Sequence, residues 1–275
     1  MSLAITLNDG ISIPQLGLGV WQVGDEEATG VVLTALEAGY RHVDSAQGYQ
    51  NEAGVGRALA QSGIPRDQIF VTTKLTNELH ARDDARRATH QSLEKLGLDY
   101  VDLYLIHWPA VLKYGEAYLE SWEVLNEAKA EGLVRSIGVS NFNPDHLDRL
   151  LTVSDTVPSV NQIECHPTFA RTDMAAELSS RGIALEAWSP LGQAQDLQAP
   201  VIGGIAGDLG RTPAQVIIRW HLQKGNIVIP KSVTPSRIVE NADVFSFELS
   251  ADQMAAIDAL DAGNRIGPDP ATATF

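Results

Sequence analysis

The stretch Val101–His107, which reads Val-Asp-Leu-Tyr-Leu-Ile-His, is a short apolar run that ends on a histidine. Seven more runs of this kind lie along the chain, and segments with helical patterns separate them. These runs are Leu16–Val20, Arg41–Asp44, Ile69–Lys74, Val134–Val139, Ser159–Ile163, Ile183–Ala187 and Ile227–Ile229. Strands that alternate with helices along a chain form a parallel sheet that the helices cover. The pattern therefore predicts an α/β protein with eight parallel strands.

Eight such strands can form an open doubly wound sheet or a closed barrel. An open sheet that binds a dinucleotide carries the pattern G-x-G-x-x-G between a strand and a helix. Gly17-Leu18-Gly19 is followed by Gln22 where the third glycine would stand, and Gly54-Val55-Gly56 is followed by Leu59. We therefore prefer the closed (β/α)8 barrel, or TIM barrel, whose usual length is close to the 275 residues of this chain.

A β-hairpin is expected before the barrel, and coil after it. Ile5 and Leu7 alternate with polar residues, residues 8–10 (Asn-Asp-Gly) predict a tight turn, and Ile11 and Ile13 resume the alternation. Residues 261–275 are rich in Gly, Pro, Asp and Thr, which is typical of coil. No linker or break in composition divides the chain, so we expect one domain over residues 1–275.

The charge and the cysteine count exclude several functions. The formal net charge is −15, and such a surface repels phosphate backbones and anionic lipids, so we expect no nucleic acid and no membrane partner. Cys165 is the single cysteine, and residues 1–6 lack the pattern of a signal peptide, which favours a cytoplasmic protein. His166 stands beside Cys165 without further residues at metal-ligand spacing, so we expect no metal site.

Polar or reactive residues stand at the ends of the predicted strands, about one strand–helix unit apart. They are Asp44, Lys74, His107, Ser140, Asn141, Gln162, Trp188, Ser189 and Lys231. In a barrel the carboxyl ends of all strands meet at one mouth, where active sites lie. We therefore expect these side chains to line one pocket although they are far apart in the sequence.

Four of the residues near this mouth predict a proton-donating site. Tyr49 follows Asp44 by one short loop, and a free phenol with a pKa near 10 is a weak acid at neutral pH. An ammonium from Lys74 would stabilise the phenolate and lower that pKa, and Asp44 would neutralise the buried lysine. His107 could hydrogen-bond a substrate oxygen, so the four together suit general acid catalysis.

The sequence resembles the aldo-keto reductase family over nearly its whole length, with the short bacterial members similar to 2,5-diketo-gluconate reductases as the nearest likeness. The resemblance rests on five segments in this order: residues 44–56, 71–74, 102–108, 136–142 and 229–232. It implies that Asp44, Tyr49, Lys74 and His107 form the catalytic tetrad.

A phosphate site is predicted where Lys231–Val233 leads into a helix that begins with Thr234-Pro235. A helix N-terminus attracts anions, and Lys231 and Arg237 add positive charge there. The family resemblance implies NADPH as the cofactor, and the 2′-phosphate and adenine would lie near this segment. The residues that the resemblance implies for cofactor binding are Ser140, Asn141, Gln162, Trp188, Ser189, Leu191, Gln193, Lys231, Ser232, Val233, Arg237, Glu240 and Asn241.

The nicotinamide would be held by Ser140, Asn141 and Gln162, and its ring would stack on Trp188, where many relatives have tyrosine. We expect this change to keep the stacking and to lose any hydroxyl contact. For the substrate pocket we expect Trp21 and Trp108, which follow strand ends, and Gln47, which lies in the loop before Tyr49.

The function predicted from these residues is NADPH-dependent reduction of aldehydes, ketones or keto-sugars, including dicarbonyls, by a cytoplasmic monomer with Tyr49 as general acid. Two other functions stay open. A lyase or aldolase would use Lys74 or Lys231 as a Schiff-base nucleophile, and a non-catalytic sensor would bind NADPH without turning over a substrate. A flavin protein is disfavoured, because flavin needs no phosphate clamp of this kind.

Overall fold

The protein is described by a computed structural model that covers residues 3–275. The first two residues, which belong to the segment examined for a signal peptide, lie outside the described residues. Eight parallel strands form one sheet, with their order in space equal to their order in the sequence. They are β3 (Leu18–Gly19), β4 (His42–Asp44), β5 (Phe70–Leu75), β6 (Val101–Ile106), β7 (Val134–Ser140), β8 (Val160–Glu164), β9 (Ala184–Trp188) and β10 (Ile227–Val228).

The sheet closes on itself. Leu16, just before β3, pairs in parallel with Val228 of β10. The Gly17 N–H donates to the Val228 carbonyl at 2.9 Å, and the Val228 N–H donates to the Gln15 carbonyl at 2.8 Å. Each of the eight apolar runs overlaps one barrel strand, and the ends agree to within two residues, so the predicted (β/α)8 barrel is confirmed.

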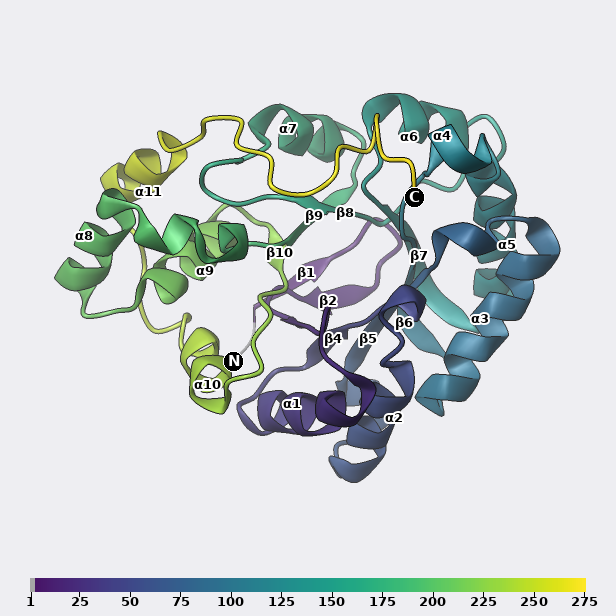
Figure 1. The fold of residues 1–275 in the computed structure, drawn as a ribbon, viewed down its shortest axis with the longest axis horizontal. Coiled ribbons are helices and arrows are strands. Elements are labelled where there is room, and N and C mark those ends of the chain that lie inside the picture. The colour runs from purple at the N-terminus through teal and green to yellow at the C-terminus, as the bar shows by residue number, and fades with distance from the viewer. Residues whose placement is uncertain (1–2) are drawn as a thin grey trace.

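Helices surround the barrel, and one follows each strand (Figure 1). They are α1 (Asp25–Glu37), α2 (Glu52–Gln61), α3 (Arg82–Leu96), α5 (Tyr118–Ala130), α6 (Pro144–Leu150), α7 (Thr172–Ser180), α9 (Pro213–Gln223) and α10 (Pro235–Ala242). Three further helices, α4 (Val111–Tyr114), α8 (Pro200–Leu209) and α11 (Ala251–Asp258), lie outside this alternation. The Thr212 side chain caps α9, but Thr234 makes no side-chain cap on α10. None of these described helices is long and apolar enough to cross a membrane.

The predicted N-terminal hairpin plugs one end of the barrel. Strands β1 (Ala4–Thr6) and β2 (Ser12–Pro14) pair antiparallel. Leu7 and Ile13 of this hairpin pack on the first apolar residues inside the barrel, which are Phe70, Leu103, Leu105, Val160 and Ile227. This end of the barrel interior is therefore largely apolar, with the buried His42 ring edge-on to Phe70.

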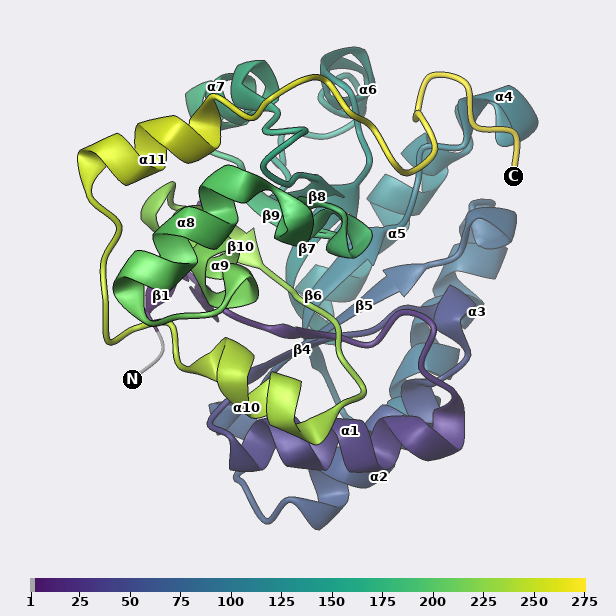
Figure 2. The ribbon, with the colours of Figure 1, turned by 60° about the vertical axis from the view of Figure 1, so that its left-hand side comes forward.

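The C-terminal segment after α11 is coil, as expected, but it is not a loose tail. In both views it runs from α11 past α7 and α6 toward α4, across the carboxyl ends of the strands (Figures 1 and 2). The Glu164 carboxylate, at the end of β8, accepts hydrogen bonds from the backbone N–H groups of Ile266 (2.6 Å) and Gly267 (3.0 Å). These bonds fix the segment over the barrel mouth.

Candidate active site

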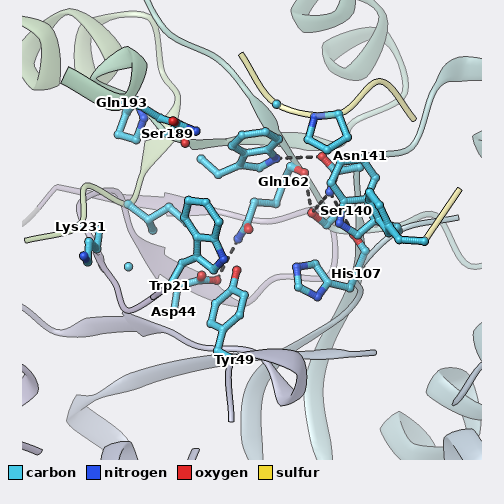
Figure 3. A pocket seen from close by; sticks show the side chains of 18 residues that line it. Trp21, Asp44, Tyr49, His107, Ser140, Asn141, Gln162, Ser189, Gln193 and Lys231 are labelled. Atoms are coloured by element: carbon cyan, nitrogen blue, oxygen red, sulfur yellow. Dashed lines mark hydrogen bonds between the residues drawn. The ribbon is translucent and has the colours of Figure 1, made fainter. Parts of the chain in front are cut away.

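A cavity of about 310 Å³ lies at the carboxyl ends of the strands, within the usual size range of small-molecule sites. Trp21, Tyr49 and His107 face this cavity (Figure 3), and Trp108 and Trp188 also line it. Outside the C-terminal segment, the lining residues come from seven of the eight strands or the loops that follow them, all except β5. Lys74 does not reach the cavity, because it is completely buried behind Asp44 and Tyr49.

The Lys74 ammonium is held by three oxygen atoms. Nζ donates to Asp44 Oδ1 at 2.6 Å, to the Ser45 carbonyl at 2.9 Å and to Tyr49 Oη at 3.4 Å. An ammonium has three donors, so this set satisfies it completely. The buried cation therefore has its counter-ion in Asp44 and is directed at the phenol oxygen that faces the cavity.

The pKa of Tyr49 corrects one expectation from the sequence. Burial raises the pKa of its hydroxyl above the ordinary value of 10.0, and the Lys74 ammonium lowers it without cancelling that effect. Burial lowers the pKa of Lys74, but the surrounding groups, with Asp44 foremost, together outweigh burial, and the net pKa is raised. Tyr49 therefore keeps its proton at neutral pH beside a permanent positive charge. It can give the proton up only to a stronger base, and Lys74 then stabilises the phenolate.

His107 is a neutral imidazole at neutral pH. Burial and the nearby Lys74 charge lower its pKa to about 3. Its ring lies edge-on to the Tyr49 ring, with 5.5 Å between the centroids. A neutral ring at this place can donate or accept a hydrogen bond beside the Tyr49 hydroxyl, but it cannot act as a strong acid.

Ser140, Asn141 and Gln162 offer hydrogen-bond acceptors rather than donors to the cavity. Asn141 Nδ2 donates to the His107 carbonyl and to Ser140 Oγ, each at 3.0 Å, and Ser140 Oγ donates to the Gln162 carbonyl at 2.8 Å. Gln162 Nε2 is also committed, since it donates to Asp44 Oδ2 and Glu186 Oε2, each at 2.9 Å. Gln162 Oε1 has no hydrogen bond within residues 3–275, and the oxygen atoms of Ser140 and Asn141 can each accept one more, which suits a ligand with an amide NH₂ group.

Trp188 keeps a polar contact that the sequence did not predict. Its indole Nε1 donates to Asn141 Oδ1 at 2.8 Å, which fixes the ring plane at the cavity wall. Gly267 of the C-terminal segment passes so close to this ring that a Cβ there would overlap it. The indole is therefore held from two sides as a stacking surface.

A second cavity of about 720 Å³ continues the first. Trp21, Ser189, Pro190, Gln193 and Lys231 line both cavities. The second cavity is also lined by the predicted cofactor residues Leu191, Ser232, Arg237, Glu240 and Asn241. Together the two cavities form one groove from the catalytic residues to the N-terminus of α10.

The second cavity holds free positive charge, with Lys231 where the two cavities join and Arg237 farther from the catalytic residues. Within residues 3–275, the Lys231 ammonium and the Arg237 guanidinium have no ion pair or side-chain hydrogen bond, although the chain carries a net charge of −15. Two unpaired cations beside a helix N-terminus suit a phosphate group.

One residue expected in the substrate pocket, Gln47, and one expected at the cofactor, Val233, line neither cavity. Gln47 is buried behind the cavity, where its Oε1 accepts from the Thr76 N–H at 3.4 Å, and it is not part of the lining. Val233 is exposed and also absent from the lining of both cavities, because its neighbours Lys231 and Ser232 occupy that wall. Conversely, Gly267, Pro268 and Phe275 line the first cavity, with the Phe275 ring 5.0 Å from that of Trp108. The coil composition of their segment gave no sign of this role.

The barrel with its buried lysine and facing tyrosine defines a class of barrel oxidoreductases, and comparison with known proteins identifies the family. The model of the aldo/keto reductase family matches residues 15–262. The chain belongs to this family, and the likeness that the sequence motifs indicated is confirmed.

Individual relatives resemble the chain over its full length. An aldo-keto reductase from Mycolicibacterium smegmatis is 52% identical over 275 residues, which are 100% of this chain and 99% of the relative. Methylglyoxal reductase DkgA from Escherichia coli is 48% identical over 97% of this chain and 96% of that enzyme. Among solved structures, a variant of Gox0644 in complex with NADPH has a TM-score of 0.96, with 46% identity over 100% of both chains.

Proposed function

We propose that this protein reduces the carbonyl group of aldehydes, ketones and keto-sugars to an alcohol with NADPH, and that Tyr49 is the general acid. The observation that carries the proposal is the hydrogen bond from the buried Lys74 ammonium to the Tyr49 hydroxyl, at the wall of a cavity. A proton donor supported by a fixed cation is what a carbonyl oxygen needs as negative charge grows on it.

The residues present fit NADPH. The acceptors of Ser140, Asn141 and Gln162 suit the carboxamide, the fixed Trp188 indole offers a stacking surface, and Lys231 and Arg237 suit the 2′-phosphate. When bound, NADPH supplies a hydride to the carbonyl carbon. The complex of the related Gox0644 variant with NADPH supports the same cofactor here.

The residues of this chain bind the carbonyl oxygen of the substrate and supply its proton. His107 and Tyr49 hold the oxygen with hydrogen bonds, Tyr49 donates its proton to it, and Lys74 stabilises the resulting phenolate. Asp44 keeps Lys74 charged through the 2.6 Å ion pair. Trp21, Trp108 and Phe275 wall the cavity with aromatic surface, which excludes water around the reacting carbonyl.

Small dicarbonyls are the substrates we propose first. The relative DkgA is named for methylglyoxal, and the first cavity is small. The partner is accordingly a small molecule, and we propose a cytoplasmic monomer. A Schiff-base mechanism through Lys74 is disfavoured, because its ammonium is fully buried and occupied by three acceptors.

The test is a panel of aldehydes, dicarbonyls and keto-sugars, assayed by the loss of NADPH absorbance. We expect turnover of dicarbonyls and no covalent adduct when borohydride is added with a carbonyl compound. Tight NADPH binding without turnover of any compound would instead support a sensor, and a trapped adduct would support a lyase.

A further inference from the structure

A second carboxyl group is buried beneath the active site, and the mechanism above does not use it. Glu186 lies on β9, opposite Gln162 of β8 and Ile227 of β10 in the barrel sheet. Its side chain is completely buried. It does not line the cavity, so it contacts the site only through other residues.

The link between Glu186 and the cavity is the amide of Gln162. Gln162 Nε2 donates one hydrogen bond to Glu186 Oε2 and one to Asp44 Oδ2, each at 2.9 Å. The amide is therefore clamped between two carboxyl groups, and only its oxygen is free. Without Glu186 the amide could rotate and present a donor to the cavity instead of an acceptor.

Glu186 has no cation of its own. Lys74 is paired with Asp44 at 2.6 Å, and Glu186 Oε1 has no hydrogen-bond partner among the described residues. An ionised Glu186 thus adds an uncompensated negative charge to the barrel interior. Burial, and next the Asp44 charge, raise the pKa of Glu186 to about 8, so it is protonated at neutral pH and ionised above pH 8.

The other titratable groups that face Glu186 are His42, Asp44, Lys74 and Tyr49. His42 of β4, whose Nε2 is 3.7 Å from Glu186 Oε1, has its pKa lowered to about 3 by burial and stays neutral. Burial also raises the pKa of Asp44, against the opposing effect of its ion pair with Lys74, and the pKa values of Lys74 and Tyr49 are raised as well. Within this cluster, Glu186 has a pKa of about 8, inside the pH range of the experiment below.

We propose that Glu186 is a positioning residue that orients the Gln162 amide toward the nicotinamide and whose charge sets the preference for the oxidised over the reduced cofactor. The proposal rests on the proposed function, since it requires the nicotinamide to bind at Gln162. The nicotinamide ring is cationic in NADP⁺ and neutral in NADPH, whereas the phosphates are the same in both. A negative charge behind Gln162 therefore strengthens NADP⁺ binding and leaves NADPH binding nearly unchanged.

The thermodynamic linkage between ionisation of Glu186 and binding of NADP⁺ gives the size and the sign of the change in affinity. If bound NADP⁺ lowers the pKa of Glu186 by one unit, the affinity of the protein for NADP⁺ rises about tenfold as the pH passes from below to above this pKa. The ratio of the dissociation constants for NADPH and NADP⁺ removes effects common to both, including titration of the 2′-phosphate. We expect this ratio to rise about tenfold between pH 6.5 and 9.5.

The experiment measures both dissociation constants over this pH range by quenching of tryptophan fluorescence, since Trp21 and Trp188 line the cavity. Glu186→Gln should make the ratio independent of pH, because the amide cannot ionise. Glu52→Gln is the matched control. Glu52 is also a buried carboxyl with a pKa raised by burial, but it bonds to Thr73 and not to Gln162, so this variant should keep the wild-type pH dependence.

Proton release gives a second measurement on the unchanged protein. Calorimetry at pH 8 in buffers of different ionisation enthalpy gives the number of protons released when a cofactor binds. We expect binding of NADP⁺ to release more protons than binding of NADPH. A constant ratio in the wild-type protein, a pH-dependent ratio that survives in Glu186→Gln, or equal proton release for both cofactors would overturn the proposal. Failure of both cofactors to bind would instead refute the proposed function itself.

Discussion

Arg237 offers a direct test of how the groove selects its cofactor. Its guanidinium lines the second cavity and, within residues 3–275, makes no ion pair or side-chain hydrogen bond that a substitution would break. Arg237→Ala should therefore leave the fold intact and remove one charge from the phosphate site. NADH lacks the 2′-phosphate, so its binding should hardly change.

The magnitude follows from the chemistry of the contact. A hydrogen bond to a charged group contributes about 1.5–3 kcal/mol, which corresponds to about 10- to 150-fold in affinity. Arg237 is exposed and Lys231 lines the same cavity, so we expect the lower limit, a loss of about tenfold for NADPH.

The assay is titration of the dissociation constants of NADPH and NADH for the wild-type protein and Arg237→Ala. Arg86→Ala is the control, because Arg86 is an exposed cation on α3 that pairs with Glu127, and its loss changes the net charge equally. An equal loss for NADPH and NADH, or the same loss of NADPH affinity in Arg86→Ala, would refute the assignment of Arg237 to the 2′-phosphate.

Three other predictions concern groups inside the barrel. His107→Ala should slow carbonyl reduction by at least tenfold while NADPH affinity persists. A steady-state rate equal to that of the wild type would show that His107 takes no part in catalysis. Lys74→Met should reduce turnover more than Asp44→Asn does, because it removes the cation that stabilises the Tyr49 phenolate; the opposite order in single-turnover rates would contradict this role. The pKa of Glu186 is raised to about 8 from its ordinary 4.5, so the folded state binds more protons and its stability falls as the pH rises through this range. Calorimetric melting curves should therefore show that the stability of Glu186→Gln relative to the wild type increases as the pH rises from 5 to 9. A difference in stability that does not change with pH would exclude this pKa shift.

The barrel was predictable from the sequence because each of its strands is a short apolar run with a polar residue at its end. That regularity placed Asp44, Lys74 and His107 at one mouth without knowledge of the closure between Leu16 and Val228. The three-dimensional arrangement followed from the topology alone, since parallel strands must bring their carboxyl ends together.

Features that depend on contacts between distant segments were not predictable. The segment with Gly267 and Phe275 has the composition of coil, and its position follows from hydrogen bonds to Glu164 that no local pattern encodes. The sequence places Lys74 near Tyr49 and so predicts a lowered pKa, whereas burial of the phenol, which depends on the tertiary structure, raises it. Gln47 was placed in the pocket by its loop, but its side chain points to the Thr76 backbone.

The central claim is that the Tyr49 hydroxyl donates the proton, and Tyr49→Phe tests it most directly. This change removes the acceptor of the 3.4 Å bond from Lys74 but keeps the ring that faces His107. The measurement is the single-turnover rate of NADPH oxidation with a dicarbonyl substrate, together with the dissociation constant of NADPH for the same variant. The account predicts nearly unchanged NADPH affinity and a rate about 10² to 10⁴ times lower. Reduction at the wild-type rate by Tyr49→Phe would contradict the mechanism.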